Sequence, residues 1–274
     1  MNIIRQVASS IVKFKYMKRI IFYFCIAFGI SLANTVYHIP IEGTIDLGLP
    51  PFIERSIAEA EENNAKAIIF EVNTFGGRVD AATQIKDAIL DSKVPTVAFI
   101  NKRAISAGAL ISLSCEKVFM AGGATIGATT AVDMQGNKAS EKVISYMREE
   151  MAATAEKRGR DKYIARGMVD EELEFPNKVM KEFINDGEVI DTIKTKVYYL
   201  VIDGDTVTVD DIEGRKQGNL ITLTTEQSLK YKIADASIEN FEAVLDTLGF
   251  SNLVVNKTTE NWSENFVRFL TNPV

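Results

Sequence analysis

Histidine and cysteine are nearly missing from this 274-residue sequence, which holds one histidine and two cysteines. The sequence shows no Cys/His cluster, so we do not expect a zinc site built from those residues. Cys25 lies in an N-terminal segment that we expect to be removed, so Cys115 would be left without a partner for an internal disulfide. We therefore expect no metal and no cofactor, and a domain stabilised by its core alone.

An excess of basic residues and a long apolar run are also lacking. The formal net charge is -6 and the pI is near 5.1, whereas nucleic-acid binders usually carry a basic surface. We therefore expect no nucleic-acid partner. The apolar run Ile20–Ala33 is shorter than the roughly 20 residues that cross a bilayer.

The first 33 residues have the layout of a secretory signal peptide. Arg and Lys residues without any acid precede the apolar run, and Ser31 and Ala33 are the small residues expected before a cleavage site. The layout of a signal peptide fits better if the chain starts at Met17 than if it starts at Met1. The alternative is an uncleaved N-terminal anchor. Either way, we expect export across the cytoplasmic membrane and a membrane-associated protein on the extracytoplasmic face.

Strands and helices alternate in the first half of the remaining chain, which predicts an α/β fold with a parallel sheet covered by helices on both faces. The expected strands are 35–46, 66–77, 94–100 and 116–123, and the expected helices are 52–65, after Pro50 and Pro51, and 78–92. The middle of the chain, through residues 140–159 and on to Phe183, is predicted to be mainly helical.

Four local features are predicted from residue 140 onward. Val143, Met147 and Met151 form one stripe of that helix, with Ile144 beside it. Two alternating runs around Asp203-Gly204 predict a hairpin near residues 196–213. Thr224 and Gln227 fit a capping box at the start of a helix. The tail from residue 251 to 274 is expected to end in an amphipathic segment, with apolar residues Trp262, Phe266, Phe269 and Leu270.

The stretch "NKRAISAGALIS" holds a candidate nucleophile, Ser106. A buried strand, a short loop and a helix opening at Ser106 would present its hydroxyl at the end of a parallel sheet, where such folds bind ligands. The amide of Ala107 would be a free donor at the helix start, suited to an oxyanion. The alternative is that Ser106 simply caps the helix with its side chain.

Paired glycines in "NTFGGRVD" form the second candidate element. Gly76 and Gly77 follow a buried strand and precede a helix, and without side chains they let backbone amides approach a substrate carbonyl. The alternative is an ordinary strand-to-helix turn. Because a serine follows the very next strand, one loop can supply an oxyanion donor and its neighbour the nucleophile.

A lysine is the expected general base. His38, the single histidine, is predicted to be a strand residue close to the mature N-terminus, which argues against a Ser-His-Asp triad. A serine can instead be activated by a neutral lysine. Lys142 is the best-placed candidate, because it lies in a first helical turn, where the helix dipole disfavours a positive charge. Lys138 lies in a polar loop and is expected to be more solvated. The alternative is that Lys142 is only a surface residue.

Three motifs, "EVNTFGGRVDAA", "NKRAISAGALIS" and "MAGGATIGATTAV", together resemble the membrane-bound ClpP-class serine proteases of the NfeD family. These stomatin operon partner proteins are related to signal peptide peptidase A on the ClpP/crotonase fold. The resemblance implies that Ser106 is the nucleophile and Lys142 the base. It also implies an oxyanion hole formed by Gly77 and Ala107, with Gly76 supporting the turn.

The resemblance also implies a substrate class and an organisation. Relatives cleave hydrophobic segments, notably of stomatin-like membrane proteins, and form dimers or larger assemblies. The expected organisation is a signal or anchor at 1–33, a ClpP-like protease domain at 34–250 with the hairpin as an insertion, and a tail at 251–274 leading toward the membrane region of longer relatives. The spacing from Ser106 to Lys142 is shorter than expected for the family, which bears on substrate preference.

We therefore expect a serine endopeptidase with a Ser106–Lys142 dyad that cleaves peptide or protein substrates with hydrophobic segments. A stomatin- or prohibitin-type membrane protein is the expected partner, and a homo-oligomer the expected assembly. Two other functions stay open at this point. One is a non-catalytic scaffold of the same fold that binds a stomatin-like protein. The other is a crotonase-type acyl-CoA enzyme, which would need a suitably placed Glu or Asp.

Overall fold

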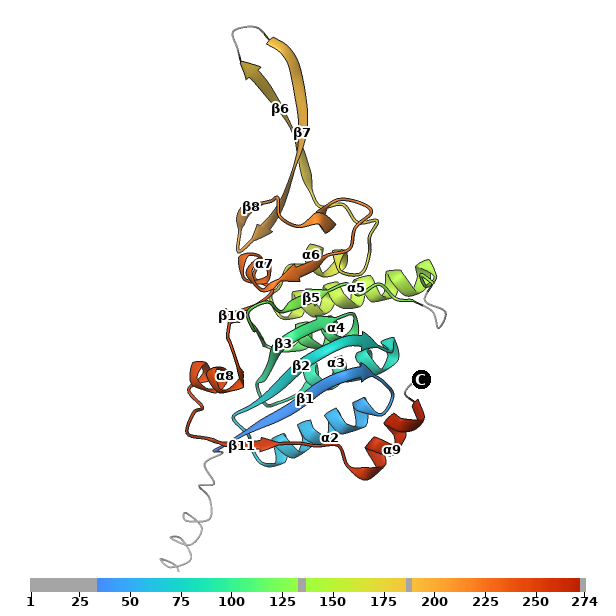
Figure 1. Cartoon of the computed structure of the whole chain (residues 1–274), viewed down its shortest axis with the longest axis vertical. Coiled ribbons are helices and arrows are strands. Elements are labelled where there is room, and N and C mark those ends of the chain that lie inside the picture. The colour runs from blue at the N-terminus through green and yellow to red at the C-terminus, as the bar shows by residue number, and fades with distance from the viewer. Residues whose placement is uncertain (1–33, 133–136, 186–188, 272–274) are drawn as a thin grey trace, which may run out of the picture. The chain divides into compact units, whose positions relative to one another are not determined.

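The computed structural model of the chain describes residues 34–132, 137–185 and 189–271. The predicted signal or anchor segment lies outside the described residues. From Thr35 onward the chain forms one compact unit, shown in Figure 1. Its helices and strands, in chain order, are β1 (Thr35–Ile45), α2 (Leu49–Glu62), β2 (Ala67–Gly77), α3 (Val79–Asp91), β3 (Thr96–Ile105), α4 (Ala107–Ser114), β4 (Lys117–Met120), β5 (Thr125–Gly127), α5 (Glu141–Lys157), α6 (Lys162–Gly167), β6 (Asn177–Asn185), β7 (Val189–Ile202), β8 (Asp205–Val209), β9 (Thr222–Thr224), α7 (Thr225–Lys230), β10 (Ala236–Ser237), α8 (Phe241–Leu248), β11 (Val254–Lys257) and α9 (Trp262–Thr271).

A mostly parallel sheet forms the centre of this unit. Within the described residues its strands follow the order β10-β4-β3-β2-β1-β11, and all neighbours in this order run parallel. The short strand β5 pairs with the end of β3, and β9 pairs antiparallel with β5. The predicted α/β fold with a parallel sheet flanked by helices is confirmed.

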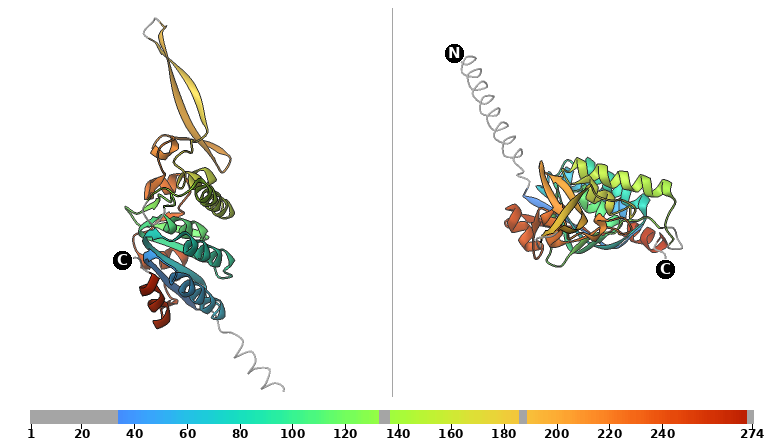
Figure 2. Two further views of the ribbon diagram at one scale, coloured as in Figure 1. Left: turned by 90° about the vertical axis from the view of Figure 1, so that its right-hand side faces the viewer. Right: turned by 90° about the horizontal axis from the view of Figure 1, so that it is seen from above.

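Alternating side chains of the central strands separate the core into two clusters, because neighbouring residues of a strand point to opposite faces. Ile68, Phe70 and Val72 of β2 belong to the larger cluster, together with residues of α2, α3, α4 and α5. Ile69 belongs to the smaller cluster, which includes Val244 of α8. The turned view in Figure 2 shows the helices α2 and α3 beside the strands. Both faces of the sheet are therefore covered, which explains why its strands are almost continuously apolar.

β3 is longer than the strand predicted at 94–100, and this extension positions the candidate nucleophile. Its first part pairs with β4, from Val97 to Ile100. The chain then changes neighbour, and Arg103–Ile105 pair with β5. The second partner lies downstream in the sequence, so local hydrophobic pattern does not reveal it. The extended strand delivers Ser106 directly to the start of α4.

Three further local predictions are corrected by the structure. Pro50 and Pro51 lie in the first turn of α2 rather than before it, a position where the missing proline N–H costs nothing. Val143 is exposed, and the buried stripe of α5 consists of Ile144, Met147 and Met151. The end of the middle segment is not helical, because β6 pairs antiparallel with β7 and β8 completes a separate three-stranded sheet.

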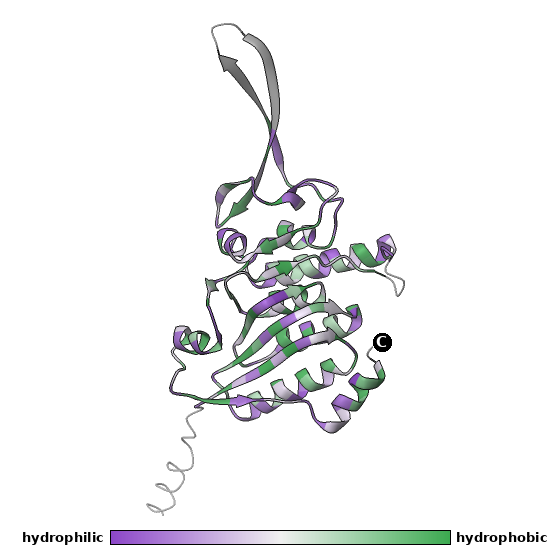
Figure 3. Ribbon diagram, viewed as in Figure 1, coloured by the Kyte–Doolittle hydropathy of each residue, from purple (hydrophilic) through white to green (hydrophobic). Residues whose placement is uncertain are grey.

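The predicted hairpin and capping box are present. Asp203 and Gly204 both have positive φ, as a type I′ turn between β7 and β8 requires. Thr224 and Gln227 exchange both hydrogen bonds of a capping box at the start of α7. The tail ends in the amphipathic helix α9, which carries strongly hydrophobic and strongly hydrophilic residues (Figure 3). Trp262 and Phe269 are 80% and 79% exposed, while Arg268 forms an ion pair with Asp46.

Arg160 joins three chain segments beneath the sheet, just beyond the end of α5. Its buried guanidinium donates to the carbonyls of Ile233 and Cys115 at 3.1 Å each, and to that of Glu116 at 3.3 Å. Asp235 is its ion-pair partner at 3.4 Å. A planar fork with several donors can satisfy these acceptors together, whereas one ammonium cannot.

We predict that Arg160→Leu lowers the free energy of unfolding by about 3 kcal/mol, because it leaves several buried acceptors without donors. Arg160→Lys should recover only part of this loss. The control Lys157→Ala removes an exposed charge from the same helix end and should change stability by less than about 0.5 kcal/mol. Urea unfolding of the three variants checks the order, and equal stabilities of Arg160→Leu and the control would contradict it.

Candidate active site

Ser106 lies in a strained turn between β3 and α4. Its φ of 55° and ψ of -120° fall in a region that residues with a side chain rarely adopt, at a cost on the order of 1–3 kcal/mol. The side chain makes no capping hydrogen bond, so the alternative role as a simple helix cap is not what the structure shows. Such a strand-to-helix turn exposes a hydroxyl at the end of a sheet.

Two contacts hold this turn in place. The backbone N–H of Ser106 donates to the carbonyl of Gly127 at 2.9 Å, which ties the turn to β5. On the other side lies Gly76, where an added Cβ would be 2.5 Å from the Cβ of Ser106 and 2.9 Å from the carbonyl oxygen of Ile105. Gly76 also has a φ of 104°, so a glycine is required there for both its conformation and its size.

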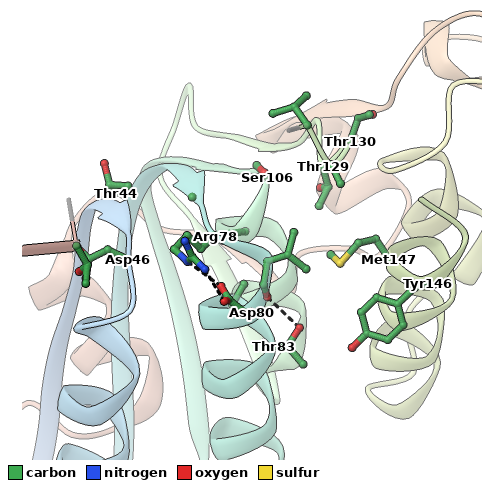
Figure 4. A pocket seen from close by; sticks show the side chains of 17 residues that line it. Thr44, Asp46, Arg78, Asp80, Thr83, Ser106, Thr129, Thr130, Tyr146 and Met147 are labelled. Atoms are coloured by element: carbon green, nitrogen blue, oxygen red, sulfur yellow. Dashed lines mark hydrogen bonds and ion pairs between the residues drawn. The ribbon is translucent and has the colours of Figure 1, made fainter. Parts of the chain in front are cut away.

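A cavity of about 1180 Å³ opens in front of Ser106. Figure 4 shows how its labelled side chains surround the space between α3 and α5. Its lining is mainly apolar or hydroxyl-bearing and comes from segments far apart in the chain: Thr44, Asp46, Gly77, Arg78, Val79, Asp80, Ala82, Thr83, Ser106, Ala107, Thr129, Thr130, Ala131, Val132, Tyr146, Met147 and Thr271. A cavity of this size and lining is suited to several residues of an extended apolar chain.

Three of the predicted site residues line this cavity together: Ser106, Gly77 and Ala107. Ala107 occupies the first position of α4, where a backbone N–H has no acceptor within its own helix. Gly77 is the last residue of β2, and its neighbour Arg78 donates its N–H to the carbonyl of Ile45 at 2.8 Å. Gly76, predicted to support the turn, packs directly behind Ser106.

Lys142 is not brought into this group. It is exposed in the first turn of α5 and is not among the cavity-lining residues, although Tyr146 and Met147 of the same helix are. Lys138 is bound elsewhere, because its ammonium donates to the carboxylate of Glu171 at 2.7 Å. That bond raises the pKa of Lys138, which opposes the neutral state that a general base needs.

His38 lies far from Ser106. It is buried in β1, its Nε2 lies 2.8 Å from Glu71, and its ring stacks on Phe241 at 4.0 Å between centroids. His38 of β1 is in register with Ile69 of β2, which is in register with Val97 of β3. Ser106 follows Val97 by nine residues, a distance on the order of 30 Å along an extended strand. The prediction that His38 is a strand residue is confirmed, and no Ser-His-Asp triad is formed with it.

Within the described residues, the two carboxylates that line the cavity are already engaged. Arg78 donates to Asp80 at 2.7 and 3.0 Å and thereby lowers the pKa of that carboxyl. Asp46 is buried, accepts from the backbone N–H of Gly48 at 2.8 Å and pairs with Arg268 at 3.0 Å. Each of these two carboxylates is held by an arginine, so neither is free to act as the base that the acyl-CoA enzyme considered from the sequence would need.

Several lining residues were not found from the sequence. Thr129 and Thr130 follow β5 in the motif "ATIGATTAV", and Tyr146 and Met147 belong to α5. The motif indicated the family but not a role for its threonines. For Met147, the apolar stripe indicated burial, and nothing in it distinguishes a core residue from one that lines a cavity.

Comparison with known proteins assigns the chain to a family. A family model described as NfeD1b, N-terminal domain, matches residues 35–188, more than half of the chain. The chain belongs to the NfeD family. The match ends between β6 and β7, so the α9 helix and most of the smaller sheet lie beyond it.

Two relatives of this NfeD chain cover most of its length. Membrane protein NfeD1b of Bacillus subtilis is 32% identical over 88% of this chain and 47% of its own length. Membrane-bound protease PH1510 of Pyrococcus horikoshii is 27% identical over 86% of this chain and 56% of its own length. The chain therefore spans about half the length of the curated relatives that it matches.

Solved structures of a protease called 1510-N share the fold. A lysine-to-alanine mutant of this membrane-bound stomatin-specific protease, in complex with a substrate peptide, superposes with a TM-score of 0.64 at 22% identity, over 88% of this chain and 100% of the other. A serine-to-alanine mutant gives 0.61 at 23% identity, over 83% and 99%. These likenesses establish the same arrangement of sheet and helices.

The described residues contain neither a membrane-spanning helix nor a cluster of metal ligands. No helix between residues 34 and 271, outside the gaps at 133–136 and 186–188, combines the length and apolarity needed to cross a bilayer. The same ranges contain no group of three or more His, Cys, Asp or Glu residues arranged to hold a metal ion.

We predict that Gly76→Ala destabilises the protein by about 3 kcal/mol and displaces Ser106, because a methyl group there overlaps the Cβ of Ser106. Gly43→Ala is the matched control. Gly43 also has positive φ, at 74°, but no atom lies within 4 Å of its added Cβ, so only about 1 kcal/mol should be lost. Urea unfolding of both variants measures the difference, and equal losses would show that Gly76 is needed for φ alone.

Proposed function

We propose that the chain is a serine endopeptidase of the NfeD family with Ser106 as its nucleophile. The observation that carries this proposal is the strained Ser106 turn, which turns an uncapped hydroxyl toward a large cavity beside the amides at Gly77 and Ala107. A serine that only capped a helix would use its hydroxyl for the cap and would not require backbone strain. The protease names of PH1510 and 1510-N support this reading.

The proposed reaction follows from these groups. The Ser106 hydroxyl oxygen attacks a peptide carbonyl carbon as a base accepts its proton, and the backbone N–H groups of Gly77 and Ala107 stabilise the oxyanion. The base then returns the proton to the leaving amine as the C–N bond breaks. Water, activated by the same base, hydrolyses the acyl ester and restores the serine.

Lys142 is the base that we propose. It precedes Tyr146, which lines the cavity, by one helical turn, or about 6 Å along the axis. Residues four apart lie on the same helix face, and the flexible stem of a lysine can span such a turn. Among the described residues Lys142 has no hydrogen-bond or ion-pair partner to give up, whereas Lys138 would have to leave Glu171.

The lining of the cavity supports apolar peptide segments as substrates. Val79, Ala82, Ala131, Val132 and Met147 offer apolar contacts, and the two acidic side chains are paired with arginines. Because 1510-N is named as specific for a stomatin homologue, we propose a stomatin-like membrane protein as the natural substrate. Export to the extracytoplasmic face, a Ser-Lys dyad and a homo-oligomeric assembly belong to the same proposal.

A scaffold without activity is the second candidate, and one observation favours it. Lys142 is exposed and outside the cavity in this structure, as it would be if it had no catalytic role. A scaffold would still bind apolar segments in the cavity, but it would not require the identity of the lysine or of the serine. Activity of matched variants therefore separates the two candidates.

We predict that the purified full chain cleaves an unfolded, apolar-rich protein carrying quenched fluorophores, and that Ser106→Ala lowers kcat/KM by about a thousandfold or more. Lys142→Ala should cause a loss of similar size, because one residue without the other cannot complete the proton transfers. Lys138→Ala is the matched control and should retain activity within about threefold.

The results distinguish the proposed dyad from a different base, a different nucleophile and a scaffold without activity. If Lys138→Ala abolishes cleavage while Lys142→Ala retains it, the dyad is assigned to the wrong lysine. If Ser106→Ala cleaves like the wild type, the nucleophile is wrong. If the wild type binds the substrate without any serine-dependent cleavage, the scaffold is the better description.

A further inference from the structure

Thr129 carries a buried hydroxyl that the rest of the chain does not use. The residue is 2% exposed, and its Oγ1 has no hydrogen-bond partner among the described residues. Yet Thr129 lines the same cavity as Ser106, and in the view of Figure 4 the two lie at the same end of it. A buried hydroxyl without a hydrogen-bond partner lowers the stability of the protein. Its position in this cavity suggests that a bound ligand supplies the missing hydrogen bond.

The backbone around Thr129 is fixed by hydrogen bonds on both sides. Its N–H donates to the carbonyl of Met168 at 2.6 Å, and the N–H of Ala128 donates to that of Ile221 at 3.0 Å. Ala128 itself has a φ of 47°, a strained conformation that these bonds maintain. Just before it, the carbonyl of Gly127 accepts the N–H of Ser106. Thr129 and the nucleophile are therefore positioned by one connected piece of backbone.

Thr130 provides an internal comparison. It also lines the cavity, but its hydroxyl donates to the carbonyl of Val169 at 2.9 Å. The adjacent threonine is thus satisfied within the protein, and only Thr129 of the two is left with an unused donor and acceptor.

We propose that the Thr129 hydroxyl binds a main-chain amide or carbonyl group of the substrate, next to the bond that Ser106 attacks. This inference rests on the proposed function, since it takes a peptide as the occupant of the cavity. An extended apolar peptide offers polar groups only along its main chain. A fixed hydroxyl near the nucleophile can bind one of them whatever the side chains are, which sets the register of the peptide against Ser106.

The substrate is a better partner for Thr129 than the proposed base. A hydroxyl could instead orient the amine of Lys142, which in this structure lies outside the cavity that Thr129 lines. Measurements can distinguish a hydroxyl that binds the substrate from a hydroxyl that positions the base. The first changes peptide affinity, while the second changes the rate and its pH profile at unchanged affinity.

The test measures peptide affinity and stability in the full chain. The probe is a fluorescent peptide with leucine, valine and phenylalanine at its centre and lysines at both ends, titrated into the Ser106→Ala protein so that no cleavage intervenes. Adding Thr129→Val should weaken binding by about tenfold, the usual size of one lost hydrogen bond. Adding Thr129→Ser should restore affinity to within about threefold. The control Thr154→Val removes a buried hydroxyl that donates to the carbonyl of Glu150 at 2.7 Å outside the cavity, and it should leave affinity unchanged within about twofold.

Thermal stability gives an independent readout. If Thr129 had a structural role, its replacement would lower the Tm, whereas the proposed role predicts a higher Tm. In the absence of peptide, Thr129→Val replaces an unpartnered buried hydroxyl by a methyl group, so the Tm should rise by about 2–4 °C. Thr130→Val removes a satisfied hydrogen bond and should lower the Tm. A Tm that falls in Thr129→Val would show an internal partner and overturn the inference.

The remaining outcomes separate this inference from the proposed function. If the wild type binds the probe without cleaving it, the peptidase proposal fails, and the affinities still decide the role of Thr129. Equal affinities of the Thr129→Val and parent proteins overturn the inference, even if cleavage is slowed or its pH profile is shifted. Absence of any binding overturns it as well, because the hydroxyl would then have no peptide to hold.

Discussion

The hydrogen bond from the N–H of Ser106 to the carbonyl of Gly127 is the interaction on which the arrangement of the site depends. It keeps Ser106 in a backbone conformation that a serine would otherwise leave. It also exists only because β3 changes partner from β4 to β5 in its last residues. Sheet topology, nucleophile geometry and the start of α4 are thus consequences of one pairing.

Small residues around this bond are required by space as much as by conformation. Gly76 packs behind the Cβ of Ser106, and an added Cβ at Gly127 would lie 2.3 Å from the carbonyl of Ile221. Gly76 and Gly127 therefore restrict the position of Ser106 from two different segments of the chain. These packing contacts maintain the strained backbone at Ser106 without a cofactor or a disulfide. If the turn relaxed, strand pairing on both sides of it would be disrupted.

The charged side chains that line the cavity, among the described residues, are held in ion pairs. Arg78 is bound to Asp80, and Asp46 is bound to Arg268 of α9. The second pair also fixes the last helix at the rim, where Thr271 lines the cavity. With its charges paired, the cavity presents apolar contacts and hydroxyl groups, and such a surface selects by shape and main-chain hydrogen bonds rather than by charge.

Local patterns were sufficient wherever a structure depends on neighbours in sequence. The capping box of Thr224 and Gln227, the Asp203-Gly204 turn and the alternation of strands and helices were all predicted, since each arises from a few consecutive residues. The pattern failed at β6, because its apolar residues Val179, Met180, Phe183 and Ile184 recur at helical spacing although the segment pairs with β7. It also failed at Val143, because helical spacing alone does not say which side of a stripe the core covers.

For the site, the sequence by itself determined that a serine follows a buried strand and opens a helix, and that paired glycines follow the strand before it. Tertiary structure alone decided that Ser106, Gly77 and Ala107 share one cavity, that Thr129 joins them with an unused hydroxyl, and that Lys142 lies outside their group. The physical reason is distance along the chain. Hydrophobic period and turn chemistry act over a few residues. The cavity, in contrast, is formed by residues from β1, β2, α3, α4, α5 and α9, and strand order and helix packing decide that these elements meet.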